Sequence, residues 1–443
     1  MIFRFLLLVI LLVPRLCCGQ DEAKMDEAVQ AFAKEGRFMG SVLVARGNQV
    51  LLDKGYGSAN LEWAIPNDPT TKFRLGSLTK QFTAAAILLL EERGKLKIDD
   101  PVKVYLSDVP ASWDKVTIYH LLTHTSGIPS FTGFPDYRTT EATASTPVQL
   151  VARFRDKPLE FMPGEKWAYS NSGYVLLGYL IEKVSGEEYA KFIQTNIFDL
   201  LGMKDSGYDS NTAIIPHRAA GYEPGPKGPI NTSFIHMSIP FAAGALYSTT
   251  ENLLRWEQGL FGGKLLKAES LQKMTTPFFK NYAFGVTVET KSGEKVIAHG
   301  GGIEGFSTYL AYYPDDALTV VVLANLTGSD PERIARVLGD LAHGKEVKLP
   351  TPRTVVSVPV EKLKQYVGTY ALNPNFEIAI MLEGDQLMTQ ATKQPKFPVF
   401  AESDTKFFLK VVDAQIEFMR DAKGEVTSLI LHQGGRDQTA KRK

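Results

Sequence analysis

The run of residues 81–90 constrains the fold more than any other feature of this chain. Its ten residues, QFTAAAILLL, contain no Gly or Pro and are rich in Ala and Leu, and Gly94 follows soon after. This composition predicts a buried helix that ends near Gly94. A buried helix needs a large core around it. A chain of 443 residues with a hydrophobic content of 44% can bury such a core and leaves room for two domains.

A Ser-x-x-Lys pair opens this segment, with Ser77 in the expected first turn and Lys80 one turn later on the same face. The spacing alone is a weak signal because it occurs five times, and the other four pairs lie in polar, turn-rich stretches. At a helix start, free backbone N–H groups and the helix dipole favour an oxyanion at the serine. The same field, with burial, lowers the pKa of the lysine, so its neutral amine can act as a base. A helix N-cap with a snorkelling lysine is the structural alternative.

The only Tyr-x-Asn triplet of the chain is Tyr169-Ser170-Asn171, in a polar loop before an apolar helical segment at 175–181. A phenol in such a loop can relay a proton if a nearby ammonium lowers its pKa. The amide of Asn171 can hydrogen-bond a substrate amide or the lysine. The structural alternative is that this pair packs against one face and closes the turn.

A third element, His299-Gly300-Gly301-Gly302, lies at the inner end of a predicted strand. Glycines there leave room for a substrate along the strand edge, and they expose backbone N–H groups that can donate to an oxyanion. His299 would supply a polar or cationic side chain toward a substrate carboxylate or the Tyr169 oxygen. A Gly-rich turn with a satisfied histidine is the alternative. The literal Lys-Ser-Gly at 291–293 overlaps Ser292-Gly293-Glu294, which is predicted to form a solvent-facing hairpin tip instead.

These three elements, in this order, resemble the signature of the serine penicillin-recognising hydrolases. The closest resemblance is to the class C β-lactamase-like branch, peptidase family S12, which includes β-lactamases, DD-peptidases, D-aminopeptidases and esterases. Further family-like stretches lie at 121–129, 163–174, 242–249 and 299–306. The resemblance covers about residues 25–345 and implies a β-lactamase/transpeptidase-like fold without a metal or other cofactor.

The resemblance also implies roles for individual residues. Ser77 matches the acylated nucleophile and Lys80 the base that activates it. Tyr169 matches the proton relay to the leaving group and, later, the activator of the hydrolytic water. Asn171 matches the substrate-amide contact. The oxyanion hole would be formed by the backbone N–H of Ser77 and that of Gly302.

One position departs from the dedicated class C β-lactamases, which have Lys-Thr-Gly where this chain has His299-Gly300-Gly301. A histidine there is more similar to the peptidase and esterase relatives. Efficient β-lactam turnover is therefore not expected.

The strand pattern predicts an α/β (α+β) main domain. Its N- and C-terminal portions share one antiparallel sheet, the Ser77 helix packs against this sheet, and a helical region forms the other wall of the cleft. The expected elements are helices near 26–36 and 331–343 and strands at 41–45, 50–52, 284–290, 295–299, 309–313 and 318–324.

Beyond residue 345 the pattern changes to short apolar runs divided by turn signals, at 376–382, 407–412, 416–420 and 426–431. Such spacing predicts a small all-β domain, a β-sandwich or a barrel, which resembles the lipocalin-like domain of some of these hydrolases. Side chains more often fill a small barrel than a ligand does. Its expected job is to shape or cover the cleft or to support assembly. The predicted division is a signal peptide (1–19), the hydrolase domain (20–345), a linker (346–354) and the barrel (355–443).

The first residues predict export. Met1-Ile2-Phe3-Arg4 and the apolar stretch 5–13 have the charged head and short apolar core of a signal peptide, with cleavage near Gly19. The core is too short for a membrane span, so the mature protein is predicted to have none and to be secreted or periplasmic. Both cysteines, Cys17 and Cys18, would leave with the leader, and the mature chain would have no disulfide. A lipid anchor on one of them is the alternative.

Other function classes are disfavoured. The formal net charge is zero and no basic stripe occurs, so a nucleic-acid partner is not expected. His120 and His124 are four residues apart on a predicted helix, but no third ligand stands in a recognisable motif. The chain has no Gly-x-Ser-x-Gly elbow, His-Glu-x-x-His or phosphate-binding loop.

The sequence therefore predicts an exported serine hydrolase that forms an acyl-enzyme on Ser77. Its partner would be a small-molecule or short-peptide substrate, and a homo-oligomer is compatible with the sequence. Amides or peptides of D-amino acids and small esters are equally favoured, and β-lactams less so. The alternative function is a binder or sensor of the same fold that is acylated without turnover, or that holds a ligand without reaction.

Overall fold

The computed structural model describes residues 16–225, 228–347, 349, 353–412, 414–433 and 436–443. Residues 1–15 of the predicted leader, and residues 348 and 350–352 of the predicted linker, lie outside this description. Within the described ranges, no helix is both long and apolar enough to cross a membrane.

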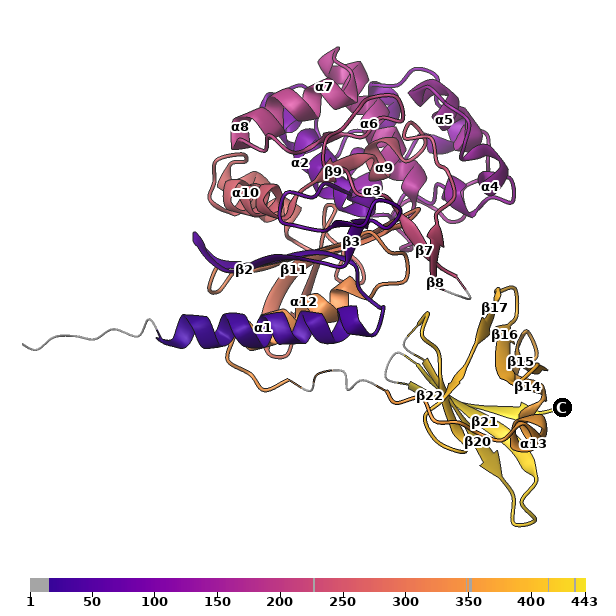
Figure 1. Ribbon diagram of the computed structural model, residues 1–443. Helices are drawn as coiled ribbons and strands as arrows, with labels where there is room; N and C mark the ends of the chain where they lie inside the picture. The colour runs from indigo at the N-terminus through magenta and orange to yellow at the C-terminus, as the bar shows by residue number, and fades with distance from the viewer. Residues whose placement is uncertain (1–15, 226–227, 348, 350–352, 413, 434–435) are drawn as a thin grey trace, which may run out of the picture.

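A six-stranded antiparallel sheet lies at the centre of the larger domain (Figure 1), in the order β10-β11-β12-β13-β1-β2. Its strands are β1 (Gly40–Arg46), β2 (Gln49–Tyr56), β10 (Thr287–Lys291), β11 (Glu294–Ile303), β12 (Phe306–Tyr313) and β13 (Leu318–Ala324). Gly40 pairs with Ala324 and Arg46 with Leu318. The N- and C-terminal portions of the domain therefore share one sheet, as predicted.

The predicted start of one strand was wrong, whereas the tip that follows it was predicted correctly. The β10 strand begins at Thr287 and not at Phe284, because Gly285 has φ +72° and the Ala283 N–H donates to the Val286 carbonyl across a turn. At the other end of β10, Lys291 pairs with Glu294. Ser292 and Gly293 form the tip between them with φ values of +53° and +90°, as expected for a two-residue hairpin.

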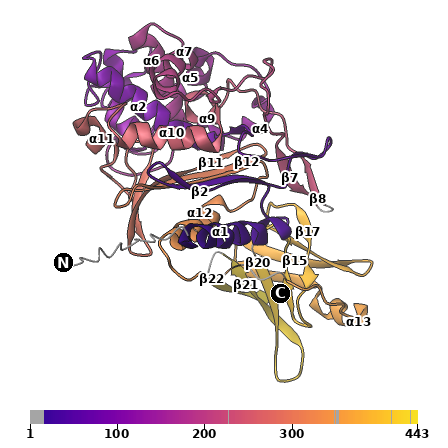
Figure 2. The same cartoon turned by 60° about the vertical axis from the view of Figure 1, so that its left-hand side comes forward.

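Helices cover both faces of this sheet (Figures 1 and 2). On one face, α1 (Leu16–Lys34) and α12 (Pro331–Ala342) pack over Val42, Val44 and Val320. On the other face, α10 (Thr250–Phe261) and the rest of the helical region pack over the alternate residues Leu43 and Val321. The period of two along each strand thus gives the sheet two buried faces.

The predicted buried helix is α2 (Thr79–Glu92), and every residue from Thr79 to Leu90 is buried. It packs against α6 (Asn171–Ser185) and α9 (Phe241–Gly244). The remaining helices of this region are α3 (Ile118–Leu122), α4 (Tyr137–Thr140), α5 (Pro147–Arg155), α7 (Tyr189–Ile193), α8 (Asp199–Leu201) and α11 (Ala268–Met274). Small sheets are formed by β5 (Phe73–Arg74), β9 (Leu246–Ser248) and β6 (Gly207–Tyr208), by β3 (Ser58–Asn60) and β4 (Ile65–Pro66), and by β7 (Tyr222–Gly225) and β8 (Gly228–Asn231).

The C-terminal domain is a nine-stranded antiparallel sheet that curls into a nearly closed barrel. Its two edge strands, β17 and β18, are consecutive in the chain, which brings the ends of the sheet together. Buried Tyr366, Phe407 and Phe418 belong to its core. The strands are β14 (Gly368–Asn373), β15 (Phe376–Glu383), β16 (Gln386–Ala391), β17 (Lys396–Pro398), β18 (Phe400–Ala401), β19 (Lys406–Phe408), β20 (Ala414–Arg420), β21 (Val426–Gln433) and β22 (Arg436–Arg442), preceded by the short helix α13 (Val360–Leu363).

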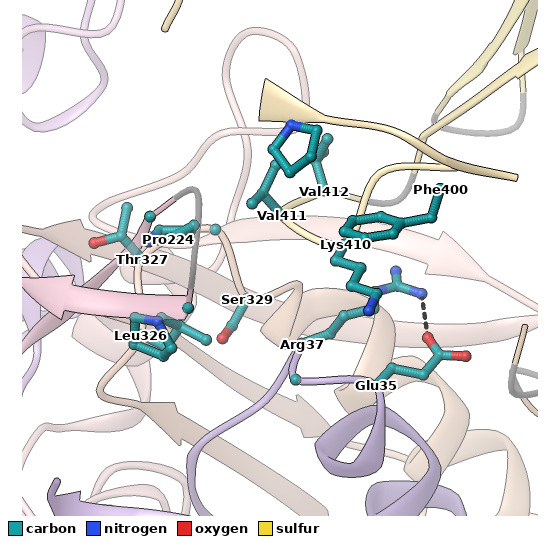
Figure 3. Close-up of a pocket in the computed structure, with 16 residues that line it drawn as sticks. Glu35, Arg37, Pro224, Leu326, Thr327, Ser329, Phe400, Lys410, Val411 and Val412 are labelled. Atoms are coloured by element: carbon teal, nitrogen blue, oxygen red, sulfur yellow. Dashed lines mark hydrogen bonds and ion pairs between the residues drawn. The ribbon is translucent and has the colours of Figure 1, made fainter. Parts of the chain in front are cut away.

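A cavity of about 360 Å³ lies at the junction of the two domains (Figure 3). The sheet domain contributes Leu326 to its lining, the β7–β8 hairpin contributes Pro224, and the C-terminal domain contributes Phe400, Lys410 and Val411. The ammonium of Lys410 lies 4.1 Å from the centre of the Phe400 ring. This junction cavity is lined mainly by apolar side chains.

Candidate active site

Ser77 lies in the 3-10 turn Gly76–Leu78, which continues directly into α2. This turn packs against β11, because a Cβ on Gly76 would lie 2.9 Å from the backbone of Gly302. Gly76 also has φ +55°, a conformation that favours glycine. The sequence thus presents Ser77 at the start of a buried helix and beside the glycines of β11.

Lys80 is fully buried one turn after Ser77, and its amine has three acceptors. Nζ donates to Ser77 Oγ at 2.9 Å, to Asn171 Oδ1 at 2.9 Å and to the Ala243 carbonyl at 2.8 Å. Burial lowers the pKa of Lys80 well below its ordinary value. In the neutral amine, the two N–H groups can donate to the amide and the carbonyl, and the lone pair can then accept the Ser77 hydroxyl proton in place of the N–H···Oγ bond.

Tyr169 lies beside both of these groups. Its ring centre is 4.8 Å from Lys80 Nζ, and its hydroxyl lies near Ser77. Burial raises the pKa of the Tyr169 phenol, and the neighbouring Ser77 hydroxyl only partly offsets this effect. The expected lowering by an ammonium is not found, because burial dominates. Tyr169 is therefore a neutral phenol with a proton to give.

Asn171 begins α6, and its side chain is held at both ends. Oδ1 accepts from Lys80, and Nδ2 donates to Thr132 Oγ1 at 3.0 Å. The Asn171 backbone N–H donates to Ser130 Oγ at 3.1 Å. Both hydroxyl residues, Ser130 and Thr132, follow the 121–129 stretch and belong to none of the three sequence elements. The amide is thereby oriented with its oxygen toward the lysine.

His299 is buried in β11, and each of its ring nitrogens has a partner. Nδ1 lies 2.5 Å from the Gly300 carbonyl, which can only accept, so Nδ1 carries the proton. Nε2 then accepts from Tyr282 Oη at 3.0 Å. Burial, assisted by Lys80, lowers the pKa of His299 to about 4. The histidine is therefore neutral near pH 7 and bonded to Tyr282, where the sequence suggested a polar or cationic group facing Tyr169 or a carboxylate.

The three glycines of β11 differ in what surrounds them. A Cβ on Gly301 would lie 2.0 Å from the Leu75 carbonyl oxygen, so only glycine allows the Ser77 turn to approach. A Cβ on Gly302 would meet nothing within 4 Å, and a Cβ on Gly300 would make ordinary contacts only. From His299 onward the strand has no partner in β10, since the pairing of these two strands ends at Ala298. In the part of the chain that the structure describes, no strand pairs with this edge of β11, which leaves it open to an extended substrate.

The prediction that His120 and His124 share one helix was wrong. The α3 helix ends at Leu122, and His124 follows with φ +58° in a left-handed conformation. Its Nδ1 accepts from the Ser170 N–H at 3.1 Å, and its ring centre lies 4.3 Å from that of Tyr169. Tyr174 and Tyr282 complete an aromatic cluster around it. No group of three or more potential metal ligands occurs among the described residues.

A cavity of about 260 Å³ opens onto this site. Ser77, Asn171 and Gly302 line it together with Ala243 and Glu304. The structure thus brings the three sequence elements to one place: a serine, a buried amine and a phenol in contact, beside a free strand edge.

A family model described as beta-lactamase matches residues 25–344, and one described as a domain of unknown function, DUF3471, matches residues 352–442. The chain belongs to the β-lactamase family, since the first match covers most of it. This confirms the resemblance to β-lactamase-like and penicillin-binding-protein-like hydrolases. The lipocalin-like assignment of the C-terminal domain stays a prediction.

Individual relatives agree with this assignment. Penicillin-binding protein 4* of Bacillus subtilis (strain 168) is 30% identical over 444 residues, covering 93% of this chain and 97% of the relative. The octameric penicillin-binding protein homologue from Pyrococcus abyssi has a TM-score of 0.66 and 27% identity over 95% of this chain and 99% of its own. A D-stereospecific amidohydrolase from Streptomyces sp. has a TM-score of 0.63 and 26% identity over 73% of this chain and 99% of its own. These relatives support a serine hydrolase of this fold.

Proposed function

We propose that this protein is an exported serine hydrolase that forms an acyl-enzyme on Ser77 and cleaves amide or ester bonds of small substrates. The observation that carries the proposal is the hydrogen bond of 2.9 Å between Lys80 Nζ and Ser77 Oγ. Two further acceptors hold the same amine, and burial disfavours its charge. A nucleophile in contact with a base that a third group orients is the arrangement of covalent catalysis.

Acylation would proceed with the proton passing from serine to leaving group. Ser77 Oγ attacks the substrate carbonyl while neutral Lys80 takes its proton. The oxyanion accepts from the N–H groups of Ser77 and Gly302. When the tetrahedral intermediate collapses, neutral Tyr169 gives its proton to the departing nitrogen or oxygen and regains one from the Lys80 ammonium. The bond to the leaving group breaks, and Ser77 carries an ester.

Deacylation would use the same groups in reverse. Water attacks the ester carbonyl, and the neutral lysine accepts its proton through Tyr169. The Ser77–carbonyl bond then breaks, and the proton returns to Ser77 Oγ. Asn171 has a substrate-binding role here in addition to its bond with Lys80: its amide can contact a substrate amide at the cavity wall. His299 acts through Tyr282 and shapes the wall beside Tyr169.

Peptides or amides of D-amino acids and small esters are the favoured substrates, with β-lactams a weaker third. The Streptomyces amidohydrolase, which its name describes as D-stereospecific, supports the amide reading. The neutral His299-Gly300-Gly301 in place of a lysine triplet argues against efficient β-lactam turnover. The octameric state of the Pyrococcus abyssi homologue supports a homo-oligomer. The apolar segment at residues 5–13 supports export, with a secreted or periplasmic location.

Intact-mass spectrometry with a fluorophosphonate tests the proposal. A single adduct that is lost in Ser77→Ala identifies the nucleophile. Release of chromophore from a D-alanyl p-nitroanilide, a p-nitrophenyl ester or a chromogenic cephalosporin then identifies the substrate class. The second candidate, a sensor that is acylated without turnover, predicts an adduct that persists with all substrates. Hydrolysis retained in Ser77→Ala would overturn the acyl-enzyme proposal.

A further inference from the structure

A carboxylate lines the Ser77 cavity and has no role in the mechanism above. Glu304 belongs to the turn between β11 and β12, where Ile303 pairs with Phe306 and leaves only Glu304 and Gly305 at the tip. Side chains at hairpin tips usually face solvent. The Glu304 side chain, by contrast, is only 11% exposed and lines the same cavity as Ser77 and Gly302.

Glu304 and Glu141 share a single cation at this end of the cavity. Arg138 Nη1 lies 3.2 Å from Glu304 Oε1 and 3.3 Å from Glu141 Oε2, so one guanidinium is shared by two carboxylates. Arg74, the other cation that acts on Glu304, forms a cluster with buried Asp209 and Arg218. Arg138 is also 72% exposed, so solvent screens its charge. A substrate carboxylate would be repelled by Glu304, whereas an ammonium could take the place of Arg138 on the Glu304 carboxylate.

The position of Glu304 relative to β11 determines which group of a bound substrate its carboxylate can reach. Glu304 follows Gly302 by two residues, a rise of about 6.6 Å along a strand, and its side chain bridges part of that length. In an amino-acyl group the ammonium is attached to the carbon next to the reacting carbonyl. A carbonyl held at the Gly302 N–H therefore has its α-ammonium within reach of the Glu304 carboxylate.

We propose that Glu304 binds the free α-ammonium of the substrate's acyl residue. The site therefore selects amino-acid amides and peptides with an unblocked amino terminus over N-acylated or carboxylate-bearing ones. This inference rests on the proposed acyl-enzyme function at Ser77 and narrows its substrate class. Displacement of Arg138 toward solvent would free the carboxylate as the ammonium enters.

The test compares three ligands that differ only at the amino group: D-alaninamide, N-acetyl-D-alaninamide and N-succinyl-D-alaninamide. Each is measured by its protection of Ser77 against a neutral fluorophosphonate, which requires no turnover. The ammonium ligand is expected to protect at concentrations about 10- to 100-fold lower than the acetylated one, as for a charge-assisted hydrogen bond. The succinylated ligand should be weakest. The matching p-nitroanilides should follow the same order in kcat/KM.

Three variants separate direct binding from general electrostatics. Glu304→Gln should remove the advantage of the ammonium ligand over the acetylated one, each measured relative to the labelling of the same variant without ligand. Glu141→Gln is the matched control, since Glu141 shares Arg138 but does not line the cavity, and it should keep the ligand order. Arg138→Gln removes the competing cation and should keep or increase the preference for ammonium.

The inference is overturned if wild-type protein prefers the acetylated or succinylated ligand, if none of the three protects, or if Glu304→Gln keeps the ammonium preference. If Glu304→Gln does not fold, the ligand order of the wild type and of Arg138→Gln decides. Failure of the proposed acyl-enzyme function would give a different result, because Ser77 in the wild-type protein would then not be labelled at all.

Discussion

The cavity at Ser77 and the junction cavity differ both in size and in chemistry, and the smaller of the two holds the reactive groups. The junction cavity is larger, about 360 Å³ against about 260 Å³. At Ser77, however, a buried amine is fixed by three acceptors and contacts a nucleophile, whereas Lys410 at the junction is exposed and stacks on Phe400. Chemistry follows the convergence of oriented polar groups more closely than it follows empty volume.

Removal of the buried amine of Lys80 should have the largest effect on the chemistry that distinguishes the Ser77 site from the junction cavity. Lys80→Met keeps the apolar length of the side chain but deletes the base, so kcat/KM should fall by about four orders of magnitude. The melting temperature should change little, because the variant no longer carries the free-energy cost of burying an amine. Steady-state kinetics and calorimetry check both values. Lys410→Met is the matched control at the junction, and a comparable loss there would remove the distinction between the cavities.

The phenol beside Lys80 should have the next largest effect. Tyr169→Phe removes only the hydroxyl, so kcat should fall by about two to four orders of magnitude while the fold is kept. Circular dichroism controls for folding. Rates near wild type would exclude this tyrosine from the proton relay.

Two neighbouring glycines of the Ser77 site should differ in how well they tolerate an added Cβ. Gly301→Ala places a Cβ against the Leu75 carbonyl, so it should lower the free energy of unfolding by about 1–3 kcal/mol and slow fluorophosphonate labelling of Ser77. Gly302→Ala meets open space and should melt near the wild-type temperature. Denaturant titration of both variants tests this difference, which would be contradicted by equal destabilisation.

A buried acid outside both cavities gives a pH-dependent effect. Burial raises the pKa of Glu257 to about 8, and its Oε2 has no hydrogen-bond partner among the residues that the structure describes. Between the unfolded pKa of about 4.3 and pH 8, the unfolded chain releases this proton and the folded chain keeps it. Stability therefore falls as pH rises through this window, by at most about 1.4 kcal/mol per unit.

The variant Glu257→Gln removes this titration, so its stability advantage over the wild type should grow from pH 5 to pH 8. Urea unfolding at several pH values measures the difference. A constant difference between the two proteins across that range would mean that Glu257 is ionised in the folded state.

The smallest effect is expected at the junction. Lys410→Ala removes a cation–π contact at an exposed position, so it should cost about 0.5–1 kcal/mol of stability. It should leave kcat/KM within about twofold of wild type, because Lys410 does not line the Ser77 cavity. A larger kinetic effect would indicate coupling between the domains.

Much of the fold followed from local patterns in the sequence. The β13 strand, Leu318–Ala324, is fully buried and appears as a continuous apolar run, and α2 appears as an Ala- and Leu-rich one. In the C-terminal domain, the strands β14, β16, β17, β18 and β22 were missed. The exposed strand β22, RDQTAKR, has almost no apolar residues, and it is a strand because it pairs with β21.

The candidate site was predictable only where side-chain chemistry shows in the sequence. Ser77, Lys80 and Tyr169 could be found as motifs, and the structure brings them into contact. The third acceptor of Lys80 is a backbone carbonyl, that of Ala243, which every residue type possesses. Tyr282, the partner of His299, lies in a turn with no motif. Contacts of this kind depend on tertiary packing and leave no local pattern.

The pairing of Gly40 with Ala324 has a consequence for biosynthesis. The central sheet joins β1, one of the first segments to leave the ribosome, to β13, which follows only after the whole helical region. Contacts this distant in sequence form slowly. A nascent chain that lacks β13 would expose one edge of β1 and its apolar faces, so it would depend on holding factors until synthesis passes residue 324. Translation arrest before that point should yield aggregates rather than a smaller active hydrolase.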